Sequence, residues 1–573
     1  MPVRNAEIAD LFDRMAALLE IQGANPFRVR AYRNAAQTLG DLPRSVSDML
    51  ADKEDLSRLP GIGKDLAGKI VEFIDTGHLA ALEEVQKELP AGLVDLTRLP
   101  GLGPKRVKVL HEELGIRNLT DLERAARKHR IREIAGFGAK TEQRIIEALS
   151  RHAPEERRHK LADVEEIASS YLEHLQAIPG VKDVIVAGSY RRRKETVGDL
   201  DILATCKKAS PVTKGFVEYD EVDAVVSRGT TRATVLLRSG LQVDLRVVPQ
   251  VSYGAALYYF TGSKAHNIAV RTIAVKKKLK INEYGVFRGE QRVAGKTEDE
   301  IFKAVGLRYI EPELRENRGE IEAAKKNRLP RLVSMSDIRG DLHAHSNATD
   351  GHDSLREMAE AAKELGYAYL AITDHSKRVT VAHGMDEKRL RRQLDAIDRL
   401  NSRLDGIRVL KGVEVDILAD GTLDLSDSIL KRLDLTVCAV HSGFGLSRDK
   451  QSERIMRAMD NPHFKILAHP TGRLINQRPG YEIDMERVME AALERGCYLE
   501  LNAQPDRLDL HDVHCRMAKD MGLKLAISSD AHTKSNLEYM RFGVDQGRRG
   551  WLEPEDVLNT RSWRELKRLL ARP

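Results

Sequence analysis

The chain has 573 residues, more than one hydrophobic core can serve, so several domains are expected. Hydrophobic residues make up 42% and charged residues 31%, which is typical of globular domains with charged surfaces and excludes a disordered or fibrous class. No uncharged apolar stretch could cross a membrane, the first residues lack a secretory signal, and the four cysteines are scattered. We therefore expect a cytoplasmic protein with no membrane partner.

The charge differs between the two parts of the chain. Residues 1–336 contain 56 Lys and Arg against 48 Asp and Glu, whereas residues 337–573 contain 37 against 39. The net charges are therefore +8 and −2. The basic part is suited to a polyanionic partner, and the second part could gather acidic groups around cations.

Short amphipathic helices are expected at the start of the chain, in two domains over 1–90 and 91–155. A Gly-x-Gly turn before an apolar helix recurs three times, at Gly61 and Gly63, Gly101 and Gly103, and Gly136 and Gly138. Such a turn can hold a phosphate through backbone N–H groups, although a single copy would more simply permit a tight turn. Three copies in a basic region favour binding to the DNA backbone.

These turns resemble helix-hairpin-helix motifs, and the first domain is similar to the amino-terminal domain of DNA polymerase beta. In that family a lysine on the helix after the first hairpin forms a Schiff base with an abasic sugar, and Lys69 occupies the matching place. The resemblance therefore implies a deoxyribose-phosphate lyase. From the residues alone, Lys69 is more simply a solvated helix lysine, and Asp65 stands where the relative has a second lysine.

Strand-like runs begin after residue 156 and predict a mixed α+β domain over 156–250. Asp199 and Asp201 are two residues apart on an expected strand and so project to one face, and Asp244 lies on the polar side of a second strand. Paired aspartates are often ordinary surface charge. Three clustered carboxylates, however, repel one another unless cations lie between them, so two Mg²⁺ or Mn²⁺ ions that bridge them and a triphosphate are expected.

Together with the turn Gly188-Ser-Tyr-Arg-Arg192, this pattern resembles the nucleotidyltransferase palm of X-family DNA polymerases. The resemblance continues through an α/β thumb over 251–318 and implies that the three aspartates are catalytic metal ligands. It also implies that Arg271 contacts the template. The residues that it implies contact the nucleotide are Gly188, Ser189, Arg192, Gly198, Tyr259, Gly262 and Asn267. The chain departs from that family at Arg193, which replaces the usual glycine, and at Lys264, in a commonly acidic place.

A charged, proline-containing stretch over 319–336 is suited to a linker, and the periodicity of the apolar residues then changes again. Over 337–573, apolar strands alternate with amphipathic helices, which predicts a parallel sheet closed as a distorted β/α (TIM-like) barrel. Almost every expected strand ends on a potential metal ligand. Because the carboxyl ends of barrel strands meet at one mouth, nine ligands should converge there: His343, His345, Asp350, His375, Glu414, His441, His469, Asp530 and His532.

These nine ligands suit Zn²⁺ or Mn²⁺ and could hold up to three ions, whereas His352, His463, His511 and His514 are expected to be structural. The arrangement resembles the polymerase and histidinol phosphatase (PHP) family, with every ligand position filled. In that family's chemistry the ions would activate water to attack a phosphodiester. The resemblance implies three ligand sets: His343, His345, Glu414 and Asp530; Glu414, His441 and His469; and Asp350, His375 and His532.

The whole pattern is similar to the bacterial and archaeal X-family DNA polymerases with a PHP domain. It implies a monomeric, cytoplasmic repair enzyme, associated with the nucleoid when on DNA. The enzyme would add dNTPs to gapped or primer-template DNA and trim it as a 3′→5′ exonuclease, with abasic endonuclease or 3′-phosphatase activity as further options. Three alternatives stay open: a nuclease whose polymerase half only binds DNA, a non-catalytic scaffold, and a phosphatase for small substrates.

Overall fold

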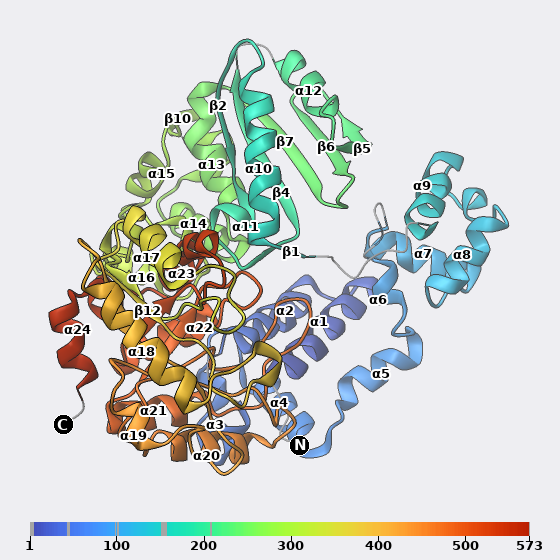
Figure 1. Cartoon of the computed structure of the whole chain (residues 1–573). Coiled ribbons are helices and arrows are strands. Elements are labelled where there is room, and N and C mark those ends of the chain that lie inside the picture. Colours follow the sequence, from blue (N-terminus) through green and yellow to red (C-terminus); the bar gives the residue numbers. More distant parts are fainter. Residues whose placement is uncertain are drawn as a thin grey trace. The chain divides into compact units, whose positions relative to one another are not determined.

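The computed structural model describes residues 5–42, 46–97, 99, 102–150, 158–206 and 209–571, and the chain divides into two compact units between residues 157 and 158 (Figure 1). Among these residues, we find no helix with both the length and the hydropathy that a membrane span requires.

The first unit is helical, as the amphipathic periodicity predicts. Its helices are α1 (Asn5–Gln22), α2 (Pro26–Asp41), α3 (Val46–Ala51), α4 (Lys64–Thr76), α5 (Ala80–Glu88), α6 (Leu93–Leu96), α7 (Pro104–Leu114), α8 (Leu119–Arg127) and α9 (Ala139–Ser150). One hydrophobic core runs from Ile8 to Ile145. The reason is that α1 is apolar on more than one face and contacts α2, α5, α6 and α7. The predicted boundary near residue 90 therefore does not separate two cores.

The second unit begins with a five-stranded sheet in the order β2-β4-β7-β6-β5. Its elements are β1 (His159–Lys160), α10 (Leu161–Gln176), β2 (Val181–Val186), α11 (Gly188–Arg191), β3 (Thr196–Val197), β4 (Asp199–Cys206), α12 (Ala209–Val217), β5 (Val222–Arg228), β6 (Arg232–Leu237) and β7 (Gln242–Val248). Val243, Leu245 and Val247 alternate with polar residues along β7 and are buried, so one face of the sheet packs on α10 and α12.

The predicted thumb follows, with a small sheet in the order β10-β9-β8. Its elements are α13 (Tyr253–Thr261), α14 (Lys264–Lys276), β8 (Lys280–Asn282), β9 (Gly285–Arg288), β10 (Gln291–Ala294) and α15 (Glu298–Val305). The stretch predicted as a linker contains helix α16 (Glu320–Lys325). Glu320 is fully buried there, 2.7 Å from His266 Nδ1 on α14. Glu320 is thus part of the packing, whereas Lys325, Lys326 and Arg328 of the same stretch are exposed.

The remaining residues form the predicted parallel barrel, in two sheets ordered β11-β12-β13 and β14-β15-β16-β17-β18. A bridge between His375, beyond β12, and Glu414 joins the two sheets on one side, and a bridge between Ala344, beyond β11, and Ala531 joins them on the other, which closes the barrel. The strands are β11 (Gly340–Asp341), β12 (Tyr369–Ile372), β13 (Arg408–Lys411), β14 (Glu414–Asp416), β15 (Val437–Ala439), β16 (Ile466–Leu467), β17 (Tyr498–Asn502) and β18 (Leu525–Ser528). The helices are α17 (Leu355–Glu364), α18 (Glu387–Asn401), α19 (Asp427–Leu430), α20 (Arg448–Ala458), α21 (Met485–Arg495), α22 (Asp512–Met521), α23 (Met540–Arg549) and α24 (Trp563–Leu570).

Candidate functional site

The three predicted palm carboxylates lie on two neighbouring parallel strands. Asp201 on β4 is the register partner of Asp244 on β7, and Asp199 is opposite Gln242. Asp244 accepts hydrogen bonds from Thr234 Oγ1 at 2.5 Å and from Gln242 Nε2 at 2.7 Å. Burial, together with the negative charges of Asp199 and Asp244, raises the pKa of Asp201 to about 7. The cluster thus carries more negative charge than its surroundings balance.

This donor set fits divalent cations. Oxygen ligands from carboxylates are those that Mg²⁺ and Mn²⁺ prefer, and the raised pKa of Asp201 shows that a positive charge would be stabilised here. Such ions, when bound, would neutralise phosphate charge and favour attack by a hydroxyl group. Asp199, Asp201 and Asp244 are the residues that would hold them.

The glycine-serine turn packs directly against this cluster. Gly188, at the start of α11, has φ +62°, and a Cβ atom there would lie 2.5 Å from Asp201 Oδ2. Only glycine therefore fits. Lys194 N donates to the carbonyl of Ser189 at 3.1 Å, so the turn folds back on itself, and Gly198 lies beside the side chain of Arg158.

Arg192 extends from this turn to the thumb. Its Nε lies 3.0 Å from Glu316 Oε1, and its Nη1 donates to the carbonyl of Thr261 at 2.5 Å, next to Gly262. Asn267 is buried on α14 and donates from Nδ2 to the carbonyl of Tyr259 at 2.8 Å. Arg192 and Gly262 are thus in contact, as are Tyr259 and Asn267.

Arg271 lies one turn beyond Asn267 on α14 and is half-buried. Within the described residues, Asn267 Oδ1 is buried without a hydrogen-bond partner. A buried amide oxygen of this kind is suited to accept a hydrogen bond from a ligand.

The predicted DNA-backbone turns precede three helices of the first unit. Gly61 and Gly63 precede α4, Gly103 precedes α7, and Gly136 and Gly138 precede α9, whereas Gly101 lies outside the described residues. Gly61 and Gly136 have φ +75° and +87°, conformations that favour glycine. Each helix therefore begins at a glycine whose backbone N–H groups can face an anion.

Lys69, the predicted lyase nucleophile, is on α4. Its Nζ lies 2.5 Å from Asp65 Oδ1, one helical turn earlier, and its side chain is 17% exposed. The lysine that matches the family's nucleophile thus forms an ion pair with Asp65, the residue at which the chain departs from that family.

The nine predicted barrel ligands converge at the carboxyl ends of the strands. His343 and His345 follow β11, His375 follows β12, His441 follows β15 and His469 follows β16. Glu414 begins β14, Asp530 and His532 follow β18, and Asp350 lies in the loop after β11.

Glu414 is the centre of this cluster. Its Oε1 lies 3.2 Å from His441 Nε2 and 3.0 Å from His469 Nε2, and its Oε2 lies 3.3 Å from His343 Nε2 and 3.1 Å from His375 Nδ1. Burial opposes the charge of Glu414, but His375, His343 and His441 outweigh it and hold the pKa well below the usual value.

Three groups of these side chains bring their donor atoms within 4.8 Å of one another: His345, Asp350, His375 and His532; His343, His345 and Asp530; and His375, Glu414 and His441. The grouping differs from the expected sets because the His345 ring lies beside both His375 and His532, at 4.6 and 4.3 Å between centroids. Within the described part of the chain, the buried Nδ1 of His345 has no hydrogen-bond partner. Imidazole and carboxylate donors at these distances fit Zn²⁺ or Mn²⁺, which would activate water when bound.

Two buried carboxylates that the sequence analysis missed support the ligands. Glu500 lies 2.7 Å from His343 Nδ1 and accepts the backbone N–H of His469 at 2.7 Å, and Asp416 lies 3.0 Å from His441 Nδ1. Because the carboxylates hold the Nδ1 atoms of His343 and His441, the Nε2 atoms of both rings face the cluster. The signal for Glu500 was a single acidic residue within the apolar strand Tyr498–Asn502.

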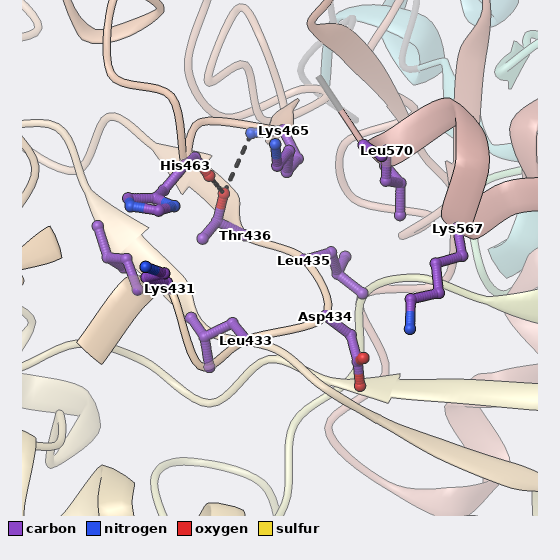
Figure 2. Close-up of a pocket in the computed structure, with 11 residues that line it drawn as sticks. Lys431, Leu433, Asp434, Leu435, Thr436, His463, Lys465, Lys567 and Leu570 are labelled. Carbon is purple, nitrogen blue, oxygen red and sulfur yellow. Dashed lines mark hydrogen bonds between the residues drawn. The ribbon is translucent and has the colours of Figure 1, made fainter. Parts of the chain in front are cut away.

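A separate pocket of about 300 Å³ lies at the other end of the barrel strands (Figure 2). It is formed by the segments that precede β15 and β16, including Thr436 and Lys465, and by Lys567 and Leu570 of α24. It contains none of the nine ligands, and we assign it no part in the chemistry.

Comparisons with known family models match five segments of the chain. Family models match residues 3–79 (helix-hairpin-helix domain), 93–151 (SAM-like helix-hairpin-helix tandem), 158–245 (DNA polymerase beta palm), 256–316 (DNA polymerase beta thumb) and 341–504 (PHP domain).

Curated relatives cover the whole chain or one of its halves. The chain is 40% identical over 570 residues to the DNA polymerase/3′-5′ exonuclease PolX of Bacillus subtilis, an alignment that covers 99% of each protein. It is 27% identical over 344 residues to DNA polymerase lambda of Rattus norvegicus, across 54% of this chain and 56% of that protein. It is also 30% identical over 232 residues to a probable phosphatase of Thermoanaerobacter sp., across 38% of this chain and 89% of that protein.

Proposed function

The chain belongs to the bacterial X-family DNA polymerases that carry a PHP domain, and we propose that its two centres perform opposite reactions on one DNA primer. It is a DNA polymerase and 3′→5′ exonuclease, and its substrate is DNA. The proposal concerns the residues that carry out each reaction and the form of the DNA.

For synthesis, the supporting observation is the placement of Asp201 opposite Asp244 and against Gly188. Asp199, Asp201 and Asp244 would hold the divalent ions, and the turn at Gly188 and Ser189 would approach the triphosphate of a dNTP through its backbone. Arg192 would donate to the same phosphates. The buried side-chain oxygen Oδ1 of Asn267 would accept a hydrogen bond from the nucleotide, and Arg271 would contact the template.

For degradation, the supporting observation is the convergence of nine ligands around Glu414. They would hold up to three Zn²⁺ or Mn²⁺ ions, and Glu500 and Asp416 would fix the ligand rings. Similarity to a probable phosphatase supports phosphoester chemistry in this barrel, so abasic endonuclease and 3′-phosphatase reactions are included in the proposal.

The DNA would be gapped or primer-template, bound by a monomer in the cytoplasm. The glycine turns at Gly63, Gly103 and Gly138 would contact the backbone without reading bases. Lys69 would act as a lyase nucleophile after its ammonium loses a proton, which requires displacement of its pairing with Asp65.

Two substitutions test the assignment on a gapped, labelled primer. Asp199→Ala is expected to abolish extension and keep primer degradation, and His343→Ala is expected to abolish degradation and keep extension. Metal analysis of both variants identifies the ions. Full extension by Asp199→Ala would refute the palm assignment and favour a nuclease with a DNA-binding half, and full degradation by His343→Ala would refute the barrel assignment.

A further inference from the structure

Helix α23 of the barrel domain lies between the barrel and the palm (Figure 1). One of its faces packs on β17 and β18 through glycines. A Cβ atom on Gly543 would lie 2.6 Å from Ile527 Cγ2 and 2.7 Å from Ala503 Cβ. The helix is therefore in close contact with β18, the strand that leads to the ligand Asp530.

The opposite face of α23 contacts the nucleotide turn of the palm. Asp545 Oδ2 lies 2.6 Å from Arg193 Nε. Arg549, one helical turn later and buried, donates from Nη1 to the carbonyl of Arg192 at 2.8 Å and to Glu316 Oε1 at 3.1 Å. Glu316 also accepts from Arg192 Nε, so Arg549 fixes both the backbone and the side-chain partner of Arg192.

Arg193 is the residue of the turn that connects the palm to helix α23. It has φ +54°, a left-handed conformation in which an arginine is disfavoured and a glycine is not. Its guanidinium lies 2.6 Å both from Glu165 of the palm and from Asp545 of the barrel. The two ion pairs offset the unfavourable backbone angle and attach the turn to the second domain.

A second connection reaches the same turn from the mouth of the barrel. Arg473 follows the ligand His469 by four residues, and its Nη1 and Nη2 lie 3.2 and 2.6 Å from the two carboxylate oxygens of Glu195. Glu195 is two residues after Arg193. Barrel side chains therefore hold the turn at Arg192, Arg193 and Glu195.

We propose that Asp545 and Arg549 are positioning residues for DNA synthesis: they hold the 188–193 turn in the conformation that binds the dNTP triphosphate. The inference rests on the proposed role of this turn in nucleotide binding. It makes the barrel a structural part of the polymerase site as well as a nuclease. Loss of either residue should weaken dNTP binding while leaving the nine barrel ligands in place.

Steady-state gap filling by the full chain tests this inference. Asp545→Asn and Arg549→Lys should each raise KM for dNTP by roughly three- to thirtyfold, the range for residues that support a site without contacting the ligand, with a smaller change in kcat. Primer degradation should keep the wild-type rate. Asp460→Asn provides a matched control, because Asp460 pairs with Arg495 at 2.7 Å within the barrel.

A double-mutant cycle shows whether Asp545 acts through the turn. Arg193→Gly removes the ion pair but retains a residue suited to φ +54°, and in that background Asp545→Asn should cause no further rise in KM. An unchanged KM in Asp545→Asn, an equal rise in the Asp460→Asn control, or independent effects in the cycle would each overturn the inference. Failure of the proposed function is distinguishable, because Asp199→Ala would then retain extension.

Discussion

Glu298 is expected to stabilise the second unit only while it is ionised. It is 7% exposed at the start of α15, and it accepts from Arg191 at 2.8 and 2.7 Å and from Arg315 Nη1 at 2.6 Å. Burial would raise its pKa, but Arg315 and Arg191 outweigh burial and lower it to about 2. Relative to the usual 4.5, this corresponds to about 3 kcal/mol of stability at neutral pH.

The sign of the pH dependence follows from the lowered pKa. Because the folded pKa lies below the unfolded one, the contribution is complete above about pH 4.5 and is lost as the pH falls towards 2. Glu298→Gln cannot ionise. The variant should therefore be less stable than the wild type by about 3 kcal/mol at pH 7, and this difference should shrink below pH 4.5.

Urea denaturation at several pH values measures this difference. Both tryptophans, Trp551 and Trp563, are in the second unit, so their fluorescence reports on it alone. Asp299→Asn is the control on the same helix. Asp299 pairs with Lys303 on the surface, and its loss should cost less than about 1 kcal/mol. A Glu298→Gln deficit that stays constant from pH 7 to pH 3.5 would refute the reasoning.

Three further predictions concern the two centres and the lyase. Gly188→Ala should abolish extension with degradation unchanged, since the new Cβ would meet the carboxylate of Asp201 at 2.5 Å; normal extension would contradict the close packing. Glu500→Gln should lower metal affinity and degradation by about 10- to 100-fold, measured by metal analysis and primer trimming, and an unchanged metal content would refute its supporting role. Lys69→Ala should lose borohydride trapping on incised abasic DNA while Lys64→Ala retains it, and full trapping by Lys69→Ala would exclude that nucleophile.

The sequence predicted the barrel well because its strands depend on local patterns, whereas the metal-binding role of the nine residues stays a prediction. The apolar run Tyr369–Ile372 forms strand β12, and the predicted ligand His375 follows it. An apolar run that ends on a histidine or carboxylate is a short-range signal, and barrel topology alone then brings distant ligands together. The matches to family models confirm the predicted helix-hairpin-helix, palm, thumb and PHP parts of this architecture.

Contacts between distant parts of the chain left no such signal. Arg193 and Asp545 are 352 residues apart, and although Arg193 departs from the family pattern, nothing in its local sequence indicates Asp545 as its partner. The stretch over 319–336 looked like a linker because it is charged, yet Glu320 is fully buried against His266. Ion pairs of this kind depend on tertiary packing, which no periodicity encodes.

The shared core of the first unit has a consequence for how DNA is chosen. Since one hydrophobic core contains both Ile62 of the first turn and Phe137 of the third, the Gly61–Gly63 and Gly136–Gly138 turns cannot move apart without exposing apolar surface to water. Their separation is then a fixed property of the protein. A DNA whose strand breaks place phosphates at another separation would engage only one turn, so substrate geometry could be selected without any base being read.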